Sequence, residues 1–496
     1  MKTPRLAFVF ALSLATAACG TPMQQPSSDA AADQASPQPD GSTTLPDGST
    51  TPPDAQSTED ASSSNDGSTS SDGGPVGTPT WWRDIKPITD QMCASCHRSG
   101  GIGPFEISTY AQARPMSRVF ANVTQNRTMP PWQAADGCRQ LLDSRALTAE
   151  EIAKFAAWDA AGAPEGNMAD FRPAAARPNT TMPLPATPGD VVIEPTADYL
   201  PNQRRTDDYH CFIVDPALMT TRDVVGVRVR PGNARIVHHM LVFEVRTGGL
   251  AALQRLDDAE PGPGYTCYGG PGIDPNARAG TGGDLIDMDM QQIAGWAPGG
   301  VDGYMPAGTG IRLKPGSRIV MQIHYNVQPS TMGMTDRTRV ELFFGAPGAT
   351  QQALWLPQSN SSFSVPAGVG PTDPRATAVA SARNPLPLAA RIFGVFPHMH
   401  QRGHSIRVDA ITAGGTTNCL ADVPRWDFHW QQNYFFRTPY RVAAGTNADT
   451  LRTTCVWDNR PENQPFVDGM QVAPHTLTWG EGSDDEMCLN YYYVSL

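Results

Sequence analysis

The pattern of apolar and polar positions divides this chain into parts of different character. A short apolar run at residues 6–18 is followed by residues 21–80, which contain almost no large apolar side chains. Apolar residues become frequent again from Trp81 to the end of the chain. A segment such as 21–80 cannot bury enough surface to offset its ordering entropy, so we expect a disordered tether there and folded structure only after it.

The first part of the folded region has the pattern of helices. A helix is predicted at residues 148–161, because its apolar residues recur every three positions, at Ile152, Phe155 and Trp158. Thr148 and Glu151 have the spacing of a capping box, and Gly162 predicts the end of the helix. A shorter helix is expected at residues 84–88. These elements predict a small all-α domain.

From Val191 onward the apolar period changes to two residues, which predicts half-buried strands. The alternating apolar residues are Val225, Val227 and Val229, then Ile319, Met321 and Ile323, then Trp426, Phe428 and Trp430. A Pro-Gly turn at residues 230–232 follows the first of these runs, and another at residues 314–316 precedes the second. Many short strands over about 300 residues favour antiparallel sandwiches, and we expect two. The predicted fold class is therefore mainly β, with two β-sandwich domains after a small helical domain.

Length and charge limit the functions that fit this pattern. The chain has 496 residues, which suggests about three domains. Its 37 Lys and Arg face 49 Asp and Glu, which gives a net charge of −12. Much of this excess lies in residues 21–80, which hold eight Asp and one Glu but no Lys or Arg. A nucleic-acid partner is not expected, because phosphate binding needs a clustered positive surface.

The N-terminal residues have the pattern of an export signal. Two basic residues precede the apolar run, which is too short to span a bilayer. The sequence Leu14-Ala15-Thr16-Ala17-Ala18-Cys19-Gly20 resembles a bacterial lipoprotein signal, although Thr16 replaces the usual Leu or Val. The resemblance implies a signal at residues 1–19, a lipid on Cys19 and a linker at residues 20–80. The lipid would be the protein's sole attachment to a membrane, and Gly20 favours the outer membrane; plain secretion is the alternative.

A haem-attachment motif follows the tether. Cys93-Ala94-Ser95-Cys96-His97 places two thiols at the spacing of the two vinyl groups of one haem, and its His can reach the iron. A redox Cys-x-x-Cys followed by His is the alternative interpretation. Together with Trp158-x-x-x-Gly162-Ala163-Pro164, the motif makes residues 81–167 resemble a small cytochrome c domain. The resemblance implies a haem c bound by Cys93, Cys96 and His97.

The second axial ligand of this haem is expected to be a methionine. Met129, which precedes Pro130, is the first choice because cytochromes of this type usually offer Met before Pro. Met116 is the competitor, and either could serve only in packing. A thioether ligand raises the reduction potential of the haem, which suits electron delivery.

The histidines gather in a few tight settings. Five of the ten occur in His238-His239-Met240, Ile323-His324-Tyr325 and His398-Met399-His400. On a strand, His398 and His400 point to the same face and can bind one metal. Adjacent His238 and His239 would point to opposite faces, so a shared metal there requires a kink. Imidazole suits copper, and an added thioether favours Cu(I).

Five segments, in order along the chain, resemble the copper type II ascorbate-dependent monooxygenases, which include the peptidylglycine and dopamine β-hydroxylating enzymes. The segments are Asp207-Asp208-Tyr209-His210-Cys211, Val237-His238-His239-Met240-Leu241, Gln322-Ile323-His324-Tyr325, His398-Met399-His400 and Asp485-Glu486-Met487-Cys488. The resemblance implies two jelly-roll sandwiches that face each other across a water-filled cleft, each with one copper. We expect them at residues 188–347 and 348–496.

The resemblance also implies the ligands of the two copper ions. The electron-transfer copper would be bound by His238, His239 and His324. The copper that binds O2 would be bound by His398, His400 and Met487, which are also the expected catalytic residues. The histidines that match no ligand position, and that we expect to be structural or surface residues, are His210, His404, His429 and His475.

The nine cysteines can be assigned to a lipid, a haem and possible disulfides. Cys19 is assigned to the lipid, and the two cysteines of the haem motif to the haem. The resemblance implies the disulfides Cys211–Cys267 and Cys455–Cys488, the second of which lies beside Met487. Cys138 and Cys419 remain, and they either pair with each other or are free thiols.

The function implied by the resemblance is hydroxylation of a C–H bond of a small substrate with O2. We expect the fused haem to pass electrons singly to the first copper, from an unknown electron donor. Phe396 occupies the position of the arginine that binds the glycine carboxylate in the peptide-hydroxylating member, and Leu489 that of an asparagine, although Tyr491 keeps the nearby tyrosine. Peptide amidation is therefore not expected, and a smaller or more apolar substrate fits better. The alternatives are a non-enzymatic protein that relays electrons or sequesters metal, and a surface adhesion module.

Overall fold

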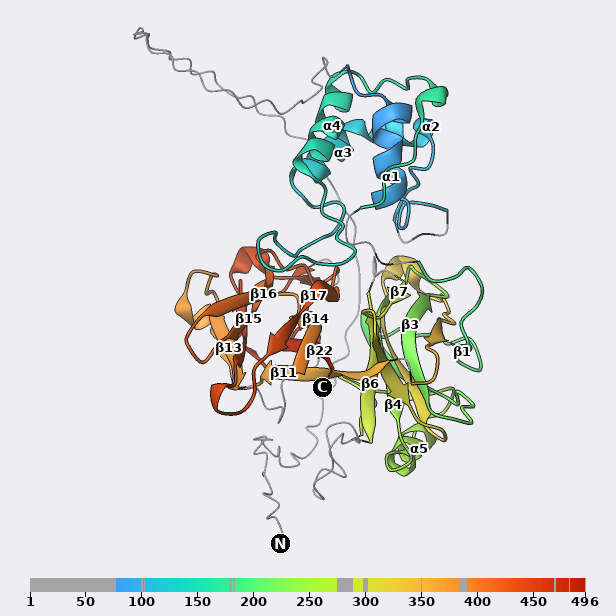
Figure 1. Cartoon of the computed structure of the whole chain (residues 1–496), viewed down its shortest axis with the longest axis vertical. Helices are drawn as coiled ribbons and strands as arrows, with labels where there is room; N and C mark the ends of the chain where they lie inside the picture. Colours follow the sequence, from blue (N-terminus) through green and yellow to red (C-terminus); the bar gives the residue numbers. More distant parts are fainter. Residues whose placement is uncertain are drawn as a thin grey trace, which may run out of the picture. The chain divides into compact units, whose positions relative to one another are not determined.

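The computed structural model describes residues 77–99, 101, 103–177, 181, 183–273, 289–297, 302–348, 350–383, 390–467, 470–480 and 482–495 (Figure 1). All of these residues belong to one unit, Val76–Leu496. The expected signal, Cys19 and nearly all of the expected tether lie outside the described residues. Among the helices described, none is long and apolar enough to cross a membrane.

Helices form the first part of the described chain. They are η1 (Trp81–Ile85, a π-helical turn), α1 (Lys86–Met92), α2 (Tyr110–Ala113), η2 (Arg114–Met116), α3 (Ser117–Gln125), α4 (Ala149–Ala160) and η3 (Met168–Asp170). The predicted helix at 148–161 is α4, in which Thr148 and Glu151 form both hydrogen bonds of a capping box. Gly162 follows it with a φ of 79°, a conformation that glycine adopts without strain. Helix α1 extends past the expected 84–88, because Pro87 lies in its first turn, where no backbone N–H is needed.

Two stacked sheets form the first half of the β region. One has the strand order β5-β2-β9-β4-β6, and the other begins β1-β10-β3-β8, with β7 paired to β3. Their bounds are β1 Val191–Ile193, β2 Asp207–Val214, β3 Arg222–Arg230, β4 Val237–Val245, β5 Tyr265–Thr266, β6 Met290–Trp296, β7 Gly303–Tyr304, β8 Thr309–Leu313, β9 Arg318–Asn326 and β10 Arg339–Phe344. Side chains from both sheets fill one core, which includes Phe212, Val242, Ile311 and Leu342. Burial of these apolar faces is the main force that holds the two sheets together.

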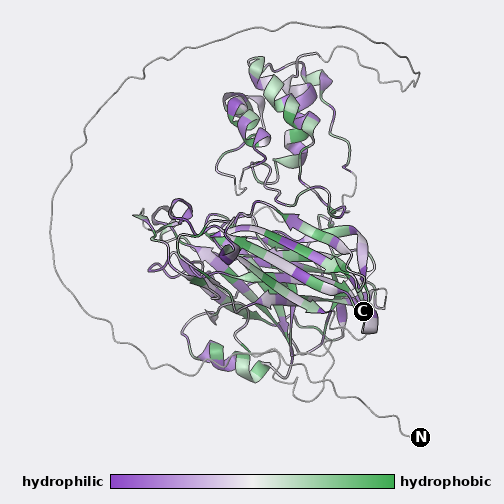
Figure 2. Ribbon diagram, turned by 90° about the vertical axis from the view of Figure 1, so that its left-hand side faces the viewer, coloured by the Kyte–Doolittle hydropathy of each residue, from purple (hydrophilic) through white to green (hydrophobic). Residues whose placement is uncertain are grey.

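A second pair of sheets follows. The order β11-β22-β14-β17 packs against β13-β18-β15-β16 around a core that includes Val395, Val408 and Trp457. The bounds are β11 Gln351–Asn360, β13 Thr377–Arg383, β14 Ala390–His398, β15 Gly403–Ile411, β16 Thr417–Val423, β17 Tyr434–Val442, β18 Thr450–Trp457 and β22 Cys488–Ser495. Parallel pairing of β8 with β11 joins the two halves into one nine-stranded sheet. The mainly β fold class is confirmed, and residues of opposite hydropathy alternate along many of the strands (Figure 2).

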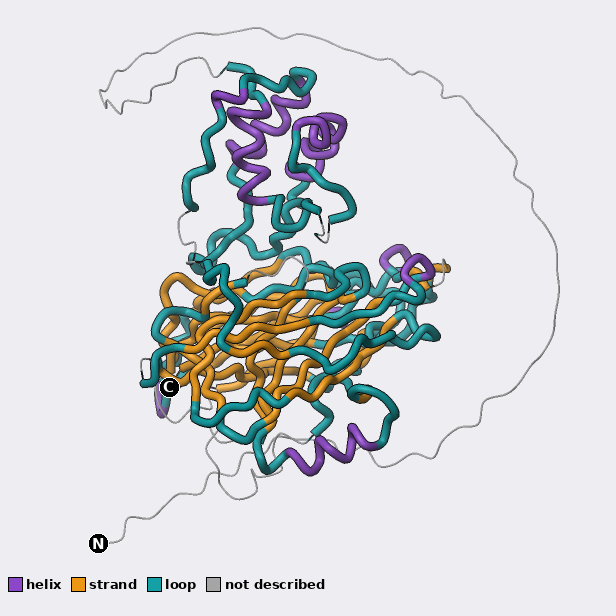
Figure 3. The backbone as a smooth tube through the Cα atoms, turned by 90° about the vertical axis from the view of Figure 1, so that its right-hand side faces the viewer, coloured by secondary structure: helices purple, strands orange, loops and turns teal. Residues whose placement is uncertain are grey.

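The smaller elements lie in the connections. They are α5 (Leu250–Asp258), η6 (Pro329–Thr331), β12 (Ser364–Val365), η7 (Pro374–Ala376), η8 (Gly445–Asn447), η9 (Pro461–Asn463), β19 (Phe466–Val467), β20 (Met470–Gln471) and β21 (Leu477–Thr478). Helix α5 lies apart from the other helices, against the first pair of sheets (Figure 3).

The prediction of half-buried strands is wrong for β9. Its residues from Ile319 to Tyr325 are all buried, because both faces of the strand are covered. One face lies in the core between the two sheets, whereas Val320 packs with Leu253 of α5 and with Cys211 and Cys267. A helix laid over a sheet therefore removes the alternation that a solvated face would keep.

Strand β3 differs from its prediction for a similar reason. Arg228 alternates with Val227 and Val229, so the predicted half-buried strand would place it on the solvent face, but only 6% of its surface is exposed. Its guanidinium is paired with Glu341 at 2.8 Å and donates to the carbonyl oxygen of Thr187 at 3.0 Å. The segment before β1 thus covers this face, and the buried charge is compensated by its partner.

The stretch from Trp426 to Trp430 was predicted to be a strand and is a turn. The backbone N–H of Trp430 donates to the carbonyl of Asp427, three residues earlier, as in a single turn. Burial nevertheless alternates, since Trp426 and Phe428 are each only 7% exposed and Asp427 and His429 are exposed. The alternating burial was predicted correctly, but the strand conformation of the backbone was not. A turn can also direct alternate side chains inward.

Three disulfides are present among the described residues. Cys211–Cys267 and Cys455–Cys488 are the two pairings that the resemblance implied. The third joins Cys138 to Cys419 and settles the pairing that the sequence left open. Cys93 and Cys96 are the free cysteines of the described part of the chain.

Candidate metal centres

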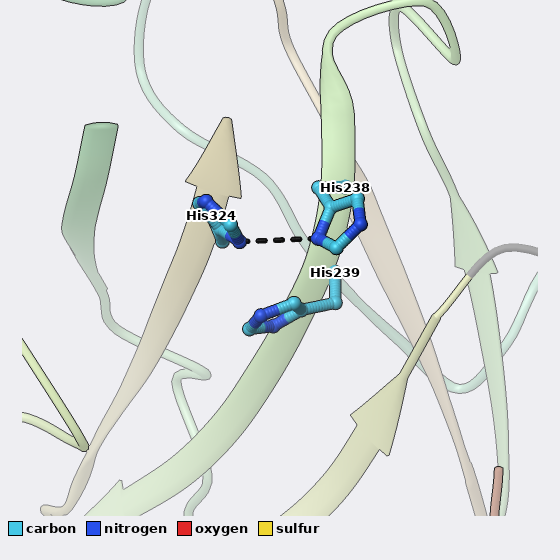
Figure 4. Close-up of side chains that lie close together, drawn as sticks. All are labelled: His238, His239 and His324. Carbon is cyan, nitrogen blue, oxygen red and sulfur yellow. Dashed lines mark hydrogen bonds between the residues drawn. The ribbon is translucent and has the colours of Figure 1, made fainter. Parts of the chain in front are cut away.

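Three histidines form a cluster in the first pair of sheets. His238 and His239 lie on β4 and His324 lies on the neighbouring strand β9, and one nitrogen from each lies within 4.8 Å of the others (Figure 4). Adjacent residues can converge here because the pairing of β4 with β9 shifts register between Val237 and His239. This irregularity is the kink that a shared metal requires. The geometry is that of a three-imidazole site.

The surroundings of His324 orient its ring. Its Nε2 lies 2.8 Å from Oδ1 of Asp207, to which it donates, and the ring of Tyr209 stacks on it at 4.1 Å between centroids. Its Nδ1 is therefore the nitrogen without the proton, and it lies 3.1 Å from Nδ1 of His238. A carboxylate behind an imidazole fixes the tautomer and raises the basicity of the free nitrogen.

The other two rings of this cluster are neutral near pH 7. Burial lowers the pKa of His238 to about 3, and repulsion from the neighbouring His324 is the second-largest cause. The same causes lower the pKa of His239 well below its usual range. A neutral imidazole is the form that binds a metal, so the lone pairs needed for coordination are available.

A second cluster lies in the second pair of sheets. His398 ends β14, His400 lies two residues further on, and Met487 directly precedes β22. The two imidazole rings are 5.1 Å apart between centroids. Their Nδ1 atoms are occupied by hydrogen bonds, that of His398 to Oε1 of Gln431 at 2.7 Å and that of His400 to the carbonyl of Asp485 at 3.1 Å. Both Nε2 atoms are therefore left as possible ligands.

One carboxylate holds this second cluster together. The fully buried Glu486 accepts hydrogen bonds from the backbone N–H of His400 at 2.9 Å and from that of Met487 at 3.3 Å. Trp457 Nε1 donates to the same oxygen at 2.8 Å. Burial lowers the pKa of His398 to about 4 and that of His400 to about 3, so both rings are neutral.

Both clusters open on one cavity of about 240 Å³. His239 of the first cluster lines it, as do His398, His400 and Met487 of the second. The remaining walls are formed mainly by apolar and aromatic side chains, among them Met240, Trp296, Phe396, Trp479, Leu489 and Tyr491. None of the described residues that line it carries a charged Lys, Arg, Asp or Glu side chain. The arrangement suits a small neutral molecule held between two metal sites.

A larger cavity, of about 480 Å³, contains the Cys-x-x-Cys-His motif. Cys93, Cys96, His97 and Met129 line it, whereas Met116 is not among its lining residues and packs against the helical core. Nδ1 of His97 lies 3.1 Å from the carbonyl oxygen of Phe105, which leaves Nε2 free. The size and the apolar walls are those of a cofactor site, so these residues fit a haem.

The far wall of this cavity comes from the β region. Its described lining includes the segment Ala234–His238, and also Asn326, His429 and Trp430. His238 therefore belongs both to the three-histidine cluster and to the wall of the Cys-x-x-Cys-His cavity. Two sites that are more than 100 residues apart in the sequence share a side chain.

Comparisons with known proteins match the part of the chain that carries the second cluster. Residues 376–495 match the family model described as copper type II ascorbate-dependent monooxygenase, C-terminal domain. This range contains His398, His400 and Met487. Over this range the chain is similar to the copper type II ascorbate-dependent monooxygenases.

Two curated relatives are similar over a longer part of the chain. The DBH-like monooxygenase protein 1 of Gallus gallus is 23% identical over 283 residues, which cover 53% of this chain and 40% of that protein. Tyramine beta-hydroxylase of Caenorhabditis briggsae is 24% identical over 318 residues, which cover 61% of this chain and 48% of that protein. The chain thus spans less than half the length of each of these relatives.

One solved structure in the comparison is the infectious bursal disease virus VP2 subviral particle. It is 12% identical, with 62% of this chain and 74% of that chain covered and a TM-score of 0.17. A score this low carries no argument about the fold or function of this chain.

Several residues around the two histidine clusters were missed by sequence reasoning. Asp207 and Gln431 each hold a histidine ring. Asp207 lies in a segment that resembles the family, but the sequence assigned neither residue a role at a metal site. Phe428 was predicted only as an apolar residue of a half-buried strand, yet its ring lies 5.1 Å from that of His238 and 5.9 Å from that of His400. Its alternation with charged neighbours signalled burial but not the two clusters that it touches.

The histidines without an expected ligand role divide into two kinds. His210 stacks on Tyr199 at 4.1 Å and hydrogen-bonds the carbonyl of Pro263, so it is structural. His404 and His475 are also outside the two clusters. His429 is exposed as expected, but its ring lies 5.6 Å from that of His238 and it lines the Cys-x-x-Cys-His cavity.

Proposed function

We propose that this protein is a copper-dependent monooxygenase that hydroxylates a C–H bond of a small neutral substrate with O2. The observation that carries the proposal is the cavity of about 240 Å³, onto which His239 opens from one cluster and His398, His400 and Met487 from the other. The family match over residues 376–495 supports the same reading. An electron-transfer site and an O2 site in one cavity fit a reaction that needs two electrons.

The donor atoms of both clusters suit copper. His238, His239 and His324 would hold one ion, and His398, His400 and Met487 the other. Bound copper supplies one-electron chemistry towards O2, and the thioether of Met487 favours the Cu(I) state. The protein contributes orientation: Asp207, Gln431 and Glu486 fix the rings and the backbone that carries them, so that the free nitrogens point inward.

Electrons are proposed to arrive through a haem c. Cys93 and Cys96 would attach it, His97 and Met129 would bind its iron, and an electron donor outside this chain would reduce it. Bound haem supplies electrons one at a time, at a potential that a methionine ligand raises. The proposal is supported by the cavity of about 480 Å³, because His238 forms part of its wall.

The substrate is proposed to be small and uncharged. Phe396 is 7% exposed and its ring stacks near that of Tyr491, at 6.1 Å between centroids, on the wall of the smaller cavity. A carboxylate placed there would meet no guanidinium among the described residues and would lose its hydration without a partner. This argues against a peptide with a free terminal carboxylate.

An exported location is part of the proposal. The three disulfides indicate an oxidising compartment. A lipid on Cys19 and attachment to the outer membrane are proposed from the resemblance of residues 1–20 to a lipoprotein signal.

The test is metal analysis followed by O2 uptake. The exported full chain should contain two copper ions and one covalent haem, and O2 consumption by the reduced protein should depend on a neutral C–H substrate. Met487→Ile should abolish hydroxylated product, whereas Met219→Ile, at a methionine that is 89% exposed, should not. Copper and haem that exchange electrons without product from any substrate would instead support the electron-relay alternative.

A further inference from the structure

The side chain of Phe428 lies between the two histidine clusters. Its ring centroid is 5.1 Å from that of His238 in the first cluster and 5.9 Å from that of His400 in the second. Both separations are within the range of aromatic rings in contact. Phe428 is only 7% exposed, so the ring is packed rather than solvated. One buried ring therefore contacts both candidate copper sites.

The turn that carries Phe428 is fixed to the second cluster. The carbonyl oxygen of Phe428 accepts from Nε2 of Gln431 at 3.1 Å, and Oε1 of the same glutamine accepts from Nδ1 of His398 at 2.7 Å. On the other side of the turn, Nε1 of Trp426 donates to the carbonyl of His400 at 3.0 Å. The second sandwich thus holds the ring, and the contact of the ring with the first cluster crosses between the sandwiches.

Phe428 also separates the clusters from a larger cavity, of about 920 Å³. The ring lines this cavity together with residues from the helical part of the chain, such as Pro131 and Trp132. None of the six expected copper ligands is among the described residues that line it, whereas four of them line the cavity of about 240 Å³. The ring therefore keeps the water of the larger cavity out of the gap between His238 and His400.

A second contact joins the two sandwiches near the clusters. The hydroxyl groups of Tyr209 and Ser483 lie 3.5 Å apart, and both residues are buried. Tyr209 stacks on His324 of the first cluster, and Ser483 lies four residues before Met487 of the second. The pairing of β8 with β11 also runs from one sandwich to the other. Packed protein, as well as the cavity between them, therefore connects the two clusters.

We infer that Phe428 is a positioning residue for electron transfer between the two clusters, because it fills the gap between His238 and His400 and gives a continuous path of contacts across it. This inference rests on the proposed function, since it requires copper at both clusters. One electron moves in each event. It leaves the copper of the first cluster, which is oxidised, and reduces the copper of the second, while no bond or proton changes place. The electron donor of the proposed function then replaces the electron.

An aromatic ring suits this position for two reasons. It is rigid and fills the gap at the density of a protein interior, so no part of the path crosses water. It also carries no hydrogen-bonding group, so it does not compete with copper for the imidazole nitrogens. A leucine would leave part of the gap unfilled, because the surrounding structure relaxes only partly around a smaller side chain. Loss of the ring should therefore slow electron transfer while both metal sites stay intact.

The experiment measures electron transfer in the full chain with copper at both clusters. The copper sites are reduced by one electron under carbon monoxide, which binds Cu(I), and a light flash removes the carbon monoxide. The electron then redistributes between the two copper ions, and the absorbance of Cu(II) gives the rate. Phe428→Leu should slow this rate severalfold, and Phe428→Tyr, which keeps the ring, should leave it near that of the wild type. The matched control is Phe436→Leu, at a 2% exposed phenylalanine in the core of the same sandwich.

A second measurement shows how the ring acts. Pulsed EPR of the fully oxidised copper sites gives the separation of the two Cu(II) ions in each variant. Slower transfer at an unchanged separation assigns the path to Phe428, and slower transfer at a wider separation assigns to it the spacing of the clusters as well.

The outcomes distinguish this inference from the function on which it rests. Equal rates in Phe428→Leu and Phe436→Leu, with both copper ions bound, would overturn the role of Phe428 and leave the proposed function standing. A wild-type chain that binds fewer than two copper ions would overturn both. Phe428→Ile makes the same test if the leucine variant fails to fold.

Discussion

Cys138 is bonded to Cys419 of β16 across 281 residues of sequence. The segment that carries Cys138 also pairs with β17, because the N–H of Leu142 donates to the carbonyl of Phe435 at 2.8 Å. Arg139 lies over the ring of Phe436, at 5.3 Å from its centroid. The helical part of the chain is thus fastened to the second sandwich, while both sandwiches contribute to the far wall of its cavity.

Removal of this bond should loosen the segment around Cys138. The double variant Cys138→Ser/Cys419→Ser is expected to lose about 2–4 kcal/mol of stability, because the unfolded chain is no longer constrained. Limited proteolysis should then cut between residues 132 and 143. Cys211→Ser/Cys267→Ser is the matched control, which should destabilise the first sandwich without exposing this segment. Equal cleavage in both double variants would contradict the prediction.

Asp207→Asn should weaken copper binding at the first cluster. The amide cannot act as a carboxylate towards Nε2 of His324, so the ring loses its fixed tautomer and part of its basicity. Loss of such a partner lowers metal affinity by about 10–100-fold. Copper titration against a chelator measures the effect, and Asp215→Asn, at a surface ion pair with Arg318, is the control. Unchanged affinity for both copper ions would count against a metal at this cluster.

Gln431→Leu should affect the second cluster alone. The leucine has a similar volume but leaves Nδ1 of His398 without its acceptor at 2.7 Å. We expect about a 10–100-fold weaker second copper and an unaltered first one, the reverse of the Asp207→Asn result. The adjacent Gln432→Leu is the control, because the side chain of Gln432 donates to the carbonyl of Pro131 and not to a ring of the second cluster. Identical losses from the two glutamine variants would show a general effect of the turn.

Phe396→Arg should change which substrates are accepted. The arginine would place a guanidinium on the wall of the smaller cavity, where no described residue is charged. Turnover of a neutral substrate should fall, and a matched carboxylate should gain affinity, because the charge is costly to bury until a carboxylate pairs with it. Initial rates with the neutral and acidic members of a substrate pair give the measurement. Phe396→Leu should keep the preference for the neutral member, and a wild-type preference for the acid would contradict the neutral-substrate proposal.

Sequence patterns predicted what depends on residues close together in the chain. The helix α4, with Thr148 and Glu151 at its start, follows from spacing alone because its hydrogen bonds join residues three or four apart. The kink expected between His238 and His239 follows from the opposite directions of neighbouring side chains on a strand. The side chains of both clusters, five imidazoles and one thioether, could likewise be named from the sequence before their positions in the fold were known.

Tertiary structure decided everything that joins distant segments. Arg228 is buried because a neighbouring segment of the chain covers it. The stretch Trp426–Trp430 is a turn, and the packing of its side chains determines that conformation. Asp207 reaches His324 and Gln431 reaches His398 only through strand pairing and a turn, and His238 joins the wall of the Cys-x-x-Cys-His cavity in the same way. The sequence by itself determined which side chains could bind copper or haem. The packing of sheets, turns and helices determined which of them meet. Apolar burial brings together segments that are distant in the sequence, and no local pattern shows which distant segment will be the partner.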